Sequence, residues 1–237
     1  MNIQMTLFAA CLAATLTSAM PSSARAGFVS NGGFEAGFTG WTRIDEAASD
    51  GTFFLQAGPT SPVSGDPVPP PPGGVTAAMT DAQGPGSHVL YQDFVIPAPM
   101  AAAFLVFDVF VGNRAGEFRT PNTLSFSTPT LNQQARVDIL TGAADPFSLL
   151  PADVLFNAYR TNVGDPLVSG YTHRVIDITA IVNANLNTPL RLRFAEVDNL
   201  FTFQFGVDNV DIVPEPSSAM LAFVGLAGMV SFRRRIR

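Results

Sequence analysis

The feature that most constrains the fold is a series of short segments rich in Val, Ile and Phe, separated by Gly, Pro, Asn and Asp. β-Branched and aromatic residues favour extended strands, and the separating residues are typical of turns. In residues 190–197, Leu and Phe alternate with Arg191 and Arg193, which predicts one buried and one solvent-facing side. The predicted strands are residues 52–57, 88–96, 103–111, 123–127, 135–140, 171–178, 190–197 and 201–212.

Helical signals are scarce by comparison. The one predicted helix is a turn or two at residues 151–159, where Pro151 suits the first turn. Residues 103–111 are apolar at almost every position, as expected for a central strand packed on both sides. This pattern predicts an all-β fold, an antiparallel two-sheet β-sandwich of jelly-roll type.

Residues 58–74 contain seven prolines, four of them consecutive. Such a segment favours an exposed, polyproline-like loop. A domain boundary is the rival interpretation, but the residues from 28 to 57 are too few to fold alone. We therefore expect one domain over residues 27–213, with its first strand close to its last.

The C-terminal segment, residues 213–237, has three parts in a fixed order. Val213, Pro214, Glu215 and Pro216 form a strip that cannot be helical. Residues 217–232 are uncharged and make a helix of about 24 Å, slightly short of a hydrocarbon core of about 30 Å. The final part of the tail is the arginine cluster Arg233, Arg234 and Arg235, followed by Ile236 and Arg237.

This order resembles the PEP-CTERM sorting signal of Gram-negative bacteria. The resemblance implies that an exosortase-type membrane protease is the partner and that residues 217–232 are a transmembrane segment of the inner membrane before processing. It also implies delivery to the cell surface or the extracellular matrix. A plain C-terminal anchor is the alternative, and it explains the apolar run without explaining the V-P-E-P strip.

The N-terminus agrees with export. Residues 7–16 are apolar, and Ala24 and Ala26 form an A-x-A cleavage site, so residues 1–26 are predicted to be a signal peptide. The single cysteine, Cys11, lies within it, which leaves residues 27–213 with no disulfide, thiol nucleophile or cysteine metal ligand.

Charge limits the partners of the domain. Eight of the 13 basic and eighteen of the 19 acidic residues lie in residues 27–213, so the domain carries a net charge of −10. The chain contains no lysine, and the domain has no basic stripe, which argues against a nucleic-acid partner. An acidic domain suits contact with calcium or a neutral polymer outside the cell.

Two segments carry a second resemblance. Residues 31–35, Asn-Gly-Gly-Phe-Glu, followed by Gly40 and Trp41, resemble the opening of galactose-binding-like and family-4-type carbohydrate-binding modules. Residues 206–212 resemble their closing strand. These families are jelly rolls that often hold a structural calcium where the first and last strands meet. The resemblance places Glu35 and Asp208 at candidate Ca²⁺ positions.

The pattern of the last strand bears on that site. The phenylalanines between 201 and 205 share one face, whereas Val210 and Ile212 share the other, which predicts a bulge at Gly206. Asp208 would then face inward and need a partner, and a cation bound by hard oxygen ligands is one answer. The other is that backbone donors or an arginine hold Asp208 while Glu35 is solvated. The residues leave both open.

Aromatic residues give little sign of a sugar-binding groove. Trp41 is expected in the core rather than on a platform. Tyr91, Tyr159 and Tyr171 are candidates for a binding surface, although Tyr91 and Tyr171 alternate with apolar neighbours. The ligand-binding residues therefore remain open.

Catalytic motifs are also lacking. His88 and His173 belong to no metal-binding pair, and no G-x-S-x-G elbow occurs. Asp108 is interpreted as a carboxylate at an edge or end position, satisfied by the backbone, rather than as a tuned acid. The sequence therefore indicates a non-enzymatic, exported protein with a structural or adhesive role in exopolysaccharide. The alternatives are a carbohydrate-binding module with a defined glycan and, less favoured, a glycan-active enzyme with paired carboxylates.

Overall fold

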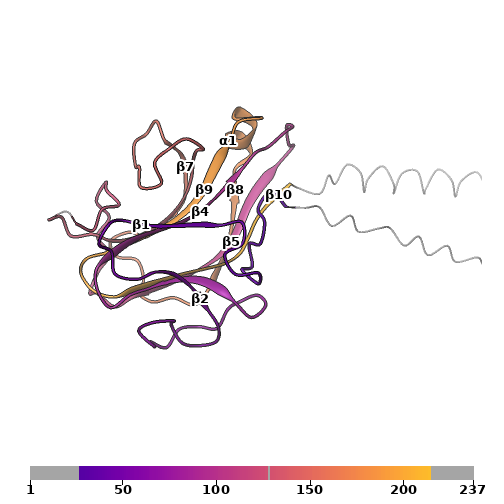
Figure 1. Cartoon of the computed structure of the whole chain (residues 1–237). Coiled ribbons are helices and arrows are strands. Elements are labelled where there is room, and N and C mark those ends of the chain that lie inside the picture. The colour runs from indigo at the N-terminus through magenta and orange to yellow at the C-terminus, as the bar shows by residue number, and fades with distance from the viewer. Residues whose placement is uncertain (1–26, 128, 215–237) are drawn as a thin grey trace, which may run out of the picture.

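The protein folds into two antiparallel five-stranded sheets packed face to face (Figure 1). The computed structural model describes residues 27–127 and 129–214. The first sheet has the order β1 (Thr42–Asp45), β4 (Gly86–Phe94), β9 (Leu190–Asp198), β6 (Gln133–Thr141) and β7 (Val154–Arg160). The second has the order β2 (Thr52–Gln56), β3 (Ala77–Asp81), β10 (Phe203–Pro214), β5 (Ala103–Asn113) and β8 (Thr172–Asp177).

From β3 to β10 the chain crosses between the sheets at almost every step, which is the connectivity of a jelly roll. The predicted all-β sandwich is confirmed. Within the described residues the one helix is α1 (Thr179–Ala184).

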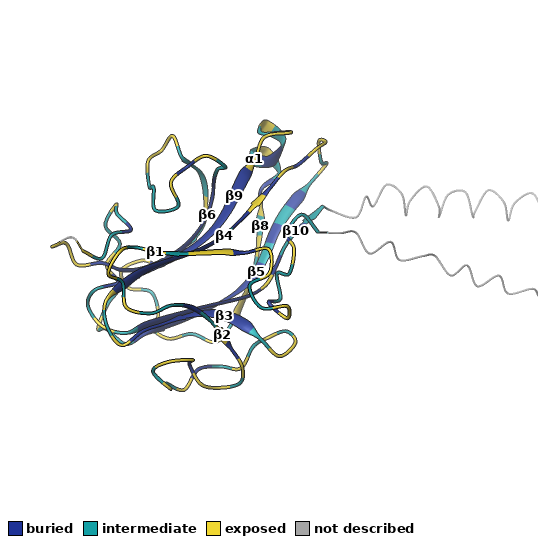
Figure 2. Ribbon diagram, viewed as in Figure 1, coloured by how far each residue is buried: buried dark blue, intermediate teal, exposed yellow. Residues whose placement is uncertain are grey.

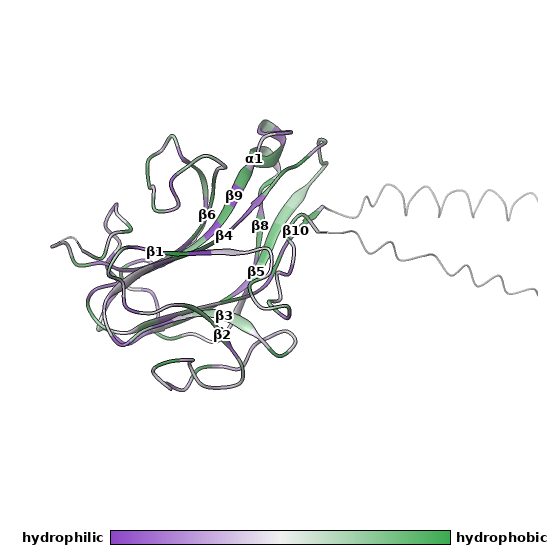
Figure 3. Ribbon diagram, in the orientation of Figure 1, coloured by the Kyte–Doolittle hydropathy of each residue, from purple (hydrophilic) through white to green (hydrophobic). Residues whose placement is uncertain are grey.

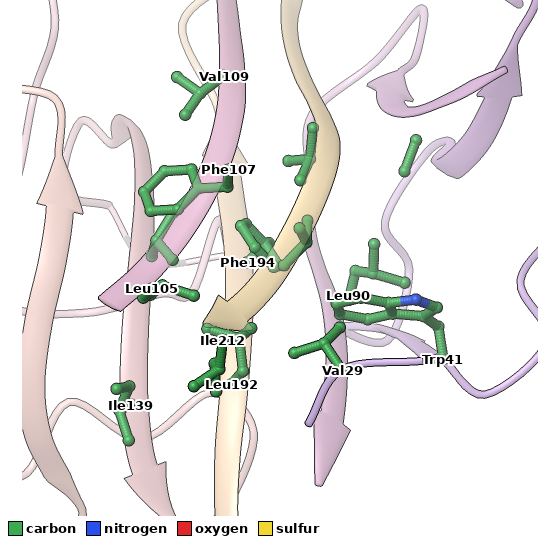
Figure 4. Packing of buried hydrophobic residues seen from close by; sticks show 14 of the residues in the cluster. Val29, Trp41, Leu90, Leu105, Phe107, Val109, Ile139, Leu192, Phe194 and Ile212 are labelled. Carbon is green, nitrogen blue, oxygen red and sulfur yellow. The ribbon is translucent and has the colours of Figure 1, made fainter. Parts of the chain in front are cut away.

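The core lies between the two sheets and is built from alternate residues of the strands. Leu105, Phe107 and Val109 of β5 point across to Phe194 of β9, and the rings of Phe107 and Phe194 lie 5.9 Å apart edge to face (Figure 4). β5, which has one charged residue in eleven, is accordingly coloured as largely hydrophobic (Figure 3). β9, at the centre of the first sheet, is buried along its whole length, and β10, at the centre of the second, is buried as far as Asp208, whereas edge strands β1 and β8 are largely exposed (Figure 2).

The two ends of the domain meet, as predicted. The backbone N–H of Val210 donates a hydrogen bond of 3.0 Å to the carbonyl oxygen of Gly32. A side chain on Gly32 would collide with that part of β10, so the close approach requires glycine. The N-terminal segment is irregular, however, and the first regular strand, β1, pairs with β4 in the other sheet.

Two local predictions are wrong. Residues 123–127 form a loop, because Leu124 is anchored in a small side cluster of apolar residues instead of joining a sheet. The helix predicted at residues 151–159 is absent: Pro151 lies in a turn, and the chain continues as edge strand β7. The β-formers Val154, Phe156 and Tyr159 prevail there over a weak helix signal.

β9 has no solvent-facing side, contrary to the prediction from Arg191 and Arg193. All nine of its residues are buried, because the segment from 142 to 150 covers the outer face. Arg193 donates hydrogen bonds to the carbonyl oxygens of Pro146 (2.7 Å) and Ser148 (2.8 Å), and it pairs with Asp138. The arginines therefore fasten a loop to the sheet.

The proline-rich residues 58–74 form a loop, as predicted, but part of it packs on the outer face of the second sheet. Val68 is buried against Met79 and Phe110. The carboxylate of Asp81 accepts hydrogen bonds from the backbone N–H groups of Val63 and Ser64. The loop is thus held to the sheet by the apolar contact of Val68 and by the hydrogen bonds to Asp81.

Candidate functional site

Several carboxylates lie close together beside a β-bulge in β10. The register between β10 and β5 shifts between Asp208 and Asp211, and Asn209 adopts a left-handed backbone conformation with φ of 51°. Asparagine tolerates that conformation better than most residues. The bulge therefore lies beyond Gly206, where the sequence pattern placed it, and Gly206 stays in register with Phe110.

The position of the bulge decides where Asp208 points. Val207 belongs to the core together with Val210 and Ile212, so Asp208 lies on the outer face and not on the inward face as predicted. It stands directly opposite Asp108 of β5 and is fully buried under the segment that contains Gly73.

Glu35 and Asp208 hold the same stretch of chain, residues 73–76. Asp208 Oδ2 accepts the N–H of Gly73 at 3.0 Å, and Glu35 Oε1 accepts the N–H groups of Val75 and Thr76 at 2.8 and 2.9 Å. These N–H donors hold the pKa of Glu35 below its ordinary value. Burial raises the pKa of Asp208 to about 6, despite its N–H donors, and the charges of Asp108 and Glu35 add to the rise.

These carboxylates offer oxygen atoms of the kind that Ca²⁺ prefers, but three of the four are already hydrogen-bond acceptors. Within residues 27–127 and 129–214, no three His, Cys, Asp or Glu side chains converge on a metal position. The arrangement fits a hydrogen-bonded clamp on residues 73–76, and calcium binding by Glu35 and Asp208 stays a prediction.

Asp108 is part of a network that the sequence did not indicate. Its Oδ1 lies 2.9 Å from Nδ1 of His173 on β8, and its Oδ2 accepts a hydrogen bond of 2.6 Å from the side-chain amide of Asn209. The His173 side chain is 59% exposed. Because the three residues belong to three different strands, only the sheet pairing reveals the group.

A second acidic pair is buried between the sheets. Glu196 and Asp198 follow the inward alternation of β9, and Glu196 Oε1 has no hydrogen-bond partner. Burial, with the nearby charge of Asp198 next in importance, raises the pKa of Glu196 well above its ordinary value. Burial likewise raises the pKa of Asp198 to about 7, against the N–H bond that it accepts from Gly86.

The aromatic residues do not form a flat platform. Trp41 is buried between Phe34 and Phe194, which confirms its predicted core role, and its indole N–H donates to the carbonyl oxygen of Asn31. The hydroxyl of Tyr171 donates to Gln56 under the proline-rich loop. Tyr159, one of the tyrosines proposed as surface residues, lines a pocket.

That pocket lies between edge strands β7 and β8, one from each sheet, and has a volume of about 470 Å³. The guanidinium carbon of Arg174 lies 5.4 Å from the centre of the Tyr159 ring. Neither Arg160 nor Arg174 forms an ion pair with a described carboxylate, and Nε of Arg174 is buried without a partner. The lining residues are Asn157, Ala158, Tyr159, Arg160, Asn162, Asp165 and Arg174.

The end of β10 carries the start of the tail. Val213 and Pro214 pair with Phe104 and Ala103 of β5, so the last strand reaches into the V-P-E-P strip. Residues 213–235 match the model of the PEP-CTERM protein-sorting motif. The chain carries a PEP-CTERM sorting signal. Such a signal marks an exported protein that is processed at the membrane.

Other predictions about the two ends fall outside the described residues. These are the signal peptide with Ala24 and Ala26, the motif residues Glu215 and Pro216, residues 217–232, and the arginines Arg233, Arg234 and Arg235. Among the helices that the structure describes, none has the length and apolarity to cross a membrane.

No curated protein sequence matches this chain. Among solved structures, it is similar to the carbohydrate-binding module TmCBM61 in complex with β-1,4-galactotriose (12% identity, TM-score 0.45, covering 80% of this chain and 99% of that chain). It is also similar to a Stig cyclase from Fischerella sp. TAU (16%, 0.46, 80% and 97%). A third is the K3 adhesin domain of Lys-gingipain from Porphyromonas gingivalis W83 (13%, 0.45, 78% and 98%). At these scores, none of the three bears on what this domain binds.

Proposed function

We propose that this is a non-enzymatic protein of the surface or extracellular matrix of a Gram-negative bacterium, with a structural or adhesive role in exopolysaccharide. An exosortase-type protease cleaves its tail near residues 213–216. The observation that carries the proposal is that the sorting motif begins inside the last strand of a complete sandwich. The β-sandwich is therefore the part of the described chain that the sorting signal would carry to the cell surface.

The pocket between β7 and β8 supports contact with a polysaccharide. It combines a tyrosine ring, two amide side chains and two arginines that form no ion pair, and such groups bind sugar rings, hydroxyls and carboxylates. Its one carboxylate, Asp165, accepts hydrogen bonds from Asn162. Most arginines of this acidic domain are paired, so two unpaired ones in a single pocket are exceptional. We infer that Arg160 and Arg174 contact an acidic polysaccharide.

Affinity electrophoresis of the protein in gels containing polygalacturonate tests this. Arg160→Gln and Arg174→Gln should each weaken retardation about tenfold, because each removes a charge-assisted hydrogen bond. Arg43→Gln is the matched control, since Arg43 stacks on Phe38 away from the pocket. Equal retardation of all variants would contradict the proposed contact.

A carbohydrate-binding module with one defined glycan is the second candidate, and the same pocket favours it. The two differ in selectivity: a structural matrix protein should bind several acidic polymers alike, whereas a module should select one oligosaccharide. A glycan array distinguishes them.

A further inference from the structure

One end of the sandwich carries two uncharged segments in an otherwise acidic domain. Residues 94–107 and 178–190 contain no charged side chain, although the domain carries a net charge of −10. The two segments meet: the side chain of Asn183 in α1 accepts from the N–H of Met100 and donates to its carbonyl oxygen, at 3.0 and 2.8 Å. The turn between β4 and β5 therefore lies beside α1 (Figure 1).

The exposed part of this end is apolar. Pro97, Ala98 and Pro99 are solvent-exposed, and Val95 is 44% exposed. The backbone N–H and C=O groups of this exposed turn still need hydrogen-bond partners. Water at a lipid headgroup layer can supply them, whereas an interface without water cannot.

Both ends of the described chain lie against the same turn. A groove of about 380 Å³ is lined by Gly27 and Phe28, by residues 97–100, and by residues 211–214. The predicted signal-peptide cleavage point and the exit of the tail are thus neighbours on this surface, as the first and last parts of the coloured ribbon are in Figure 1.

The tail allows little separation between this end and the predicted transmembrane segment. Only Glu215 and Pro216 separate Pro214 from Ser217, where the apolar run begins. Three Cα–Cα steps of 3.8 Å span at most about 11 Å. The headgroup layer on each side of the hydrocarbon core is about 6 Å thick, so this end of the domain can stand at most about 5 Å clear of it.

From these distances we propose that, while the tail is attached, the turn at residues 97–102 and the neighbouring end of α1 lie on the lipid bilayer surface. The inference rests on the proposed function, because it needs residues 217–232 to be embedded. The turn and α1 carry no charge of their own, although Asp177 and Asp211 lie beside them. The two segments are therefore neither repelled by anionic headgroups nor held to them by an arginine. The contact therefore ends when the tail is cleaved.

The test uses the full chain in a Cys11→Ser background, produced without a sorting enzyme and reconstituted into phosphatidylcholine–phosphatidylglycerol vesicles. An environment-sensitive fluorophore is attached at Ala98→Cys or at Gly116→Cys. Gly116 is exposed with open space around it and follows the opposite end of β5, so it is the matched control. Flotation after an alkaline wash reports whether the tail is embedded.

Doxyl-labelled lipids should quench the probe at position 98 by about half and leave the probe at position 116 unchanged, because only the former reaches the interface. Equal exposure of both probes in chains that float with the vesicles would overturn the inference and leave the tail assignment standing. Chains that do not float would overturn the proposed membrane tail itself. If the probe at position 98 becomes less accessible to water in detergent as the protein concentration rises, the turn contacts a second copy of the chain, and the inference is overturned.

Discussion

Asp208 stands opposite Asp108 in the register of β10 and β5, so two carboxylates occupy adjacent positions on one face of the second sheet. Asp108 is paired with His173 and Asn209, whereas Asp208 and Glu35 hold residues 73–76. The regular register ahead of the bulge produces this concentration of negative charge, and a bound cation would relieve the repulsion.

Calcium should therefore raise the melting temperature of the domain if Glu35 and Asp208 are ligands. A cation at a hundredfold excess over its Kd adds about 2.7 kcal/mol, which corresponds to roughly 5–10 °C for a domain of this size. Thermal melts in millimolar calcium and in chelator measure the effect. Glu35→Gln and Asp208→Asn should abolish the difference, and Glu117→Gln, in an exposed pair with Arg119, should not. Identical wild-type melts in both buffers would exclude a stabilising calcium.

The buried pair Glu196 and Asp198 should make stability fall with rising pH. A carboxyl with a raised folded-state pKa gives its full stabilisation below its unfolded pKa, about 4, and loses it as the pH rises through the folded value. For Asp198 that value is about 7, so the loss falls mainly between pH 4 and 7. Asp198→Asn should flatten the dependence of melting temperature on pH over this range. An unchanged slope would show that this carboxyl is hydrated in the folded protein.

Removing Arg193 should be far more damaging than removing an exposed arginine. Burial alone would raise the pKa of Asp138, but Arg136 and Arg193 outweigh it and hold that pKa below its ordinary value. Arg193→Leu leaves a buried carboxylate with one cation and two carbonyl oxygens without their donor, and should cost about 3–5 kcal/mol. Urea denaturation measures the loss, and Arg119→Leu should change stability by less than about 1 kcal/mol.

The tail should be absent from the mature protein. Intact-mass analysis of material extracted from the cell surface should give a chain that ends near residues 213–216, because two prolines in the V-P-E-P strip disfavour a helix there. Replacing Pro214 and Pro216 by alanine should slow the removal of the tail. A mature protein that still ends at Arg237 would make the tail a plain anchor.

The sequence predicted most of the fold because hydrophobic alternation reports which residues face a core. It missed β3 because that strand is short and begins with two alanines, which have low strand propensity. It misplaced Arg191 and Arg193 because alternation cannot show that a distant loop covers the outer face of a sheet. The same limit applies to the candidate site.

Neither the Asp108–His173 pair nor the pocket around Arg174 has a local signature, because each joins residues from different strands. The sequence pattern predicts the bulge at Gly206, ahead of its position in the structure, for a related reason. Glycine is the usual sign of an irregularity, but Gly206 is needed where it is to make room for Tyr171: an added Cβ would lie 2.5 Å from its hydroxyl oxygen.

Val213 and Pro214 belong at once to a strand and to a sorting motif. A foreign protein fused directly to Val213 would have no spacer between its own fold and the motif. Cutting the tail from this domain at Val213 would remove the last two pairs of β10 with β5. A transplantable export tag made from this tail should duplicate these two residues behind a flexible linker, leaving one copy to finish the sheet and the other to meet the protease.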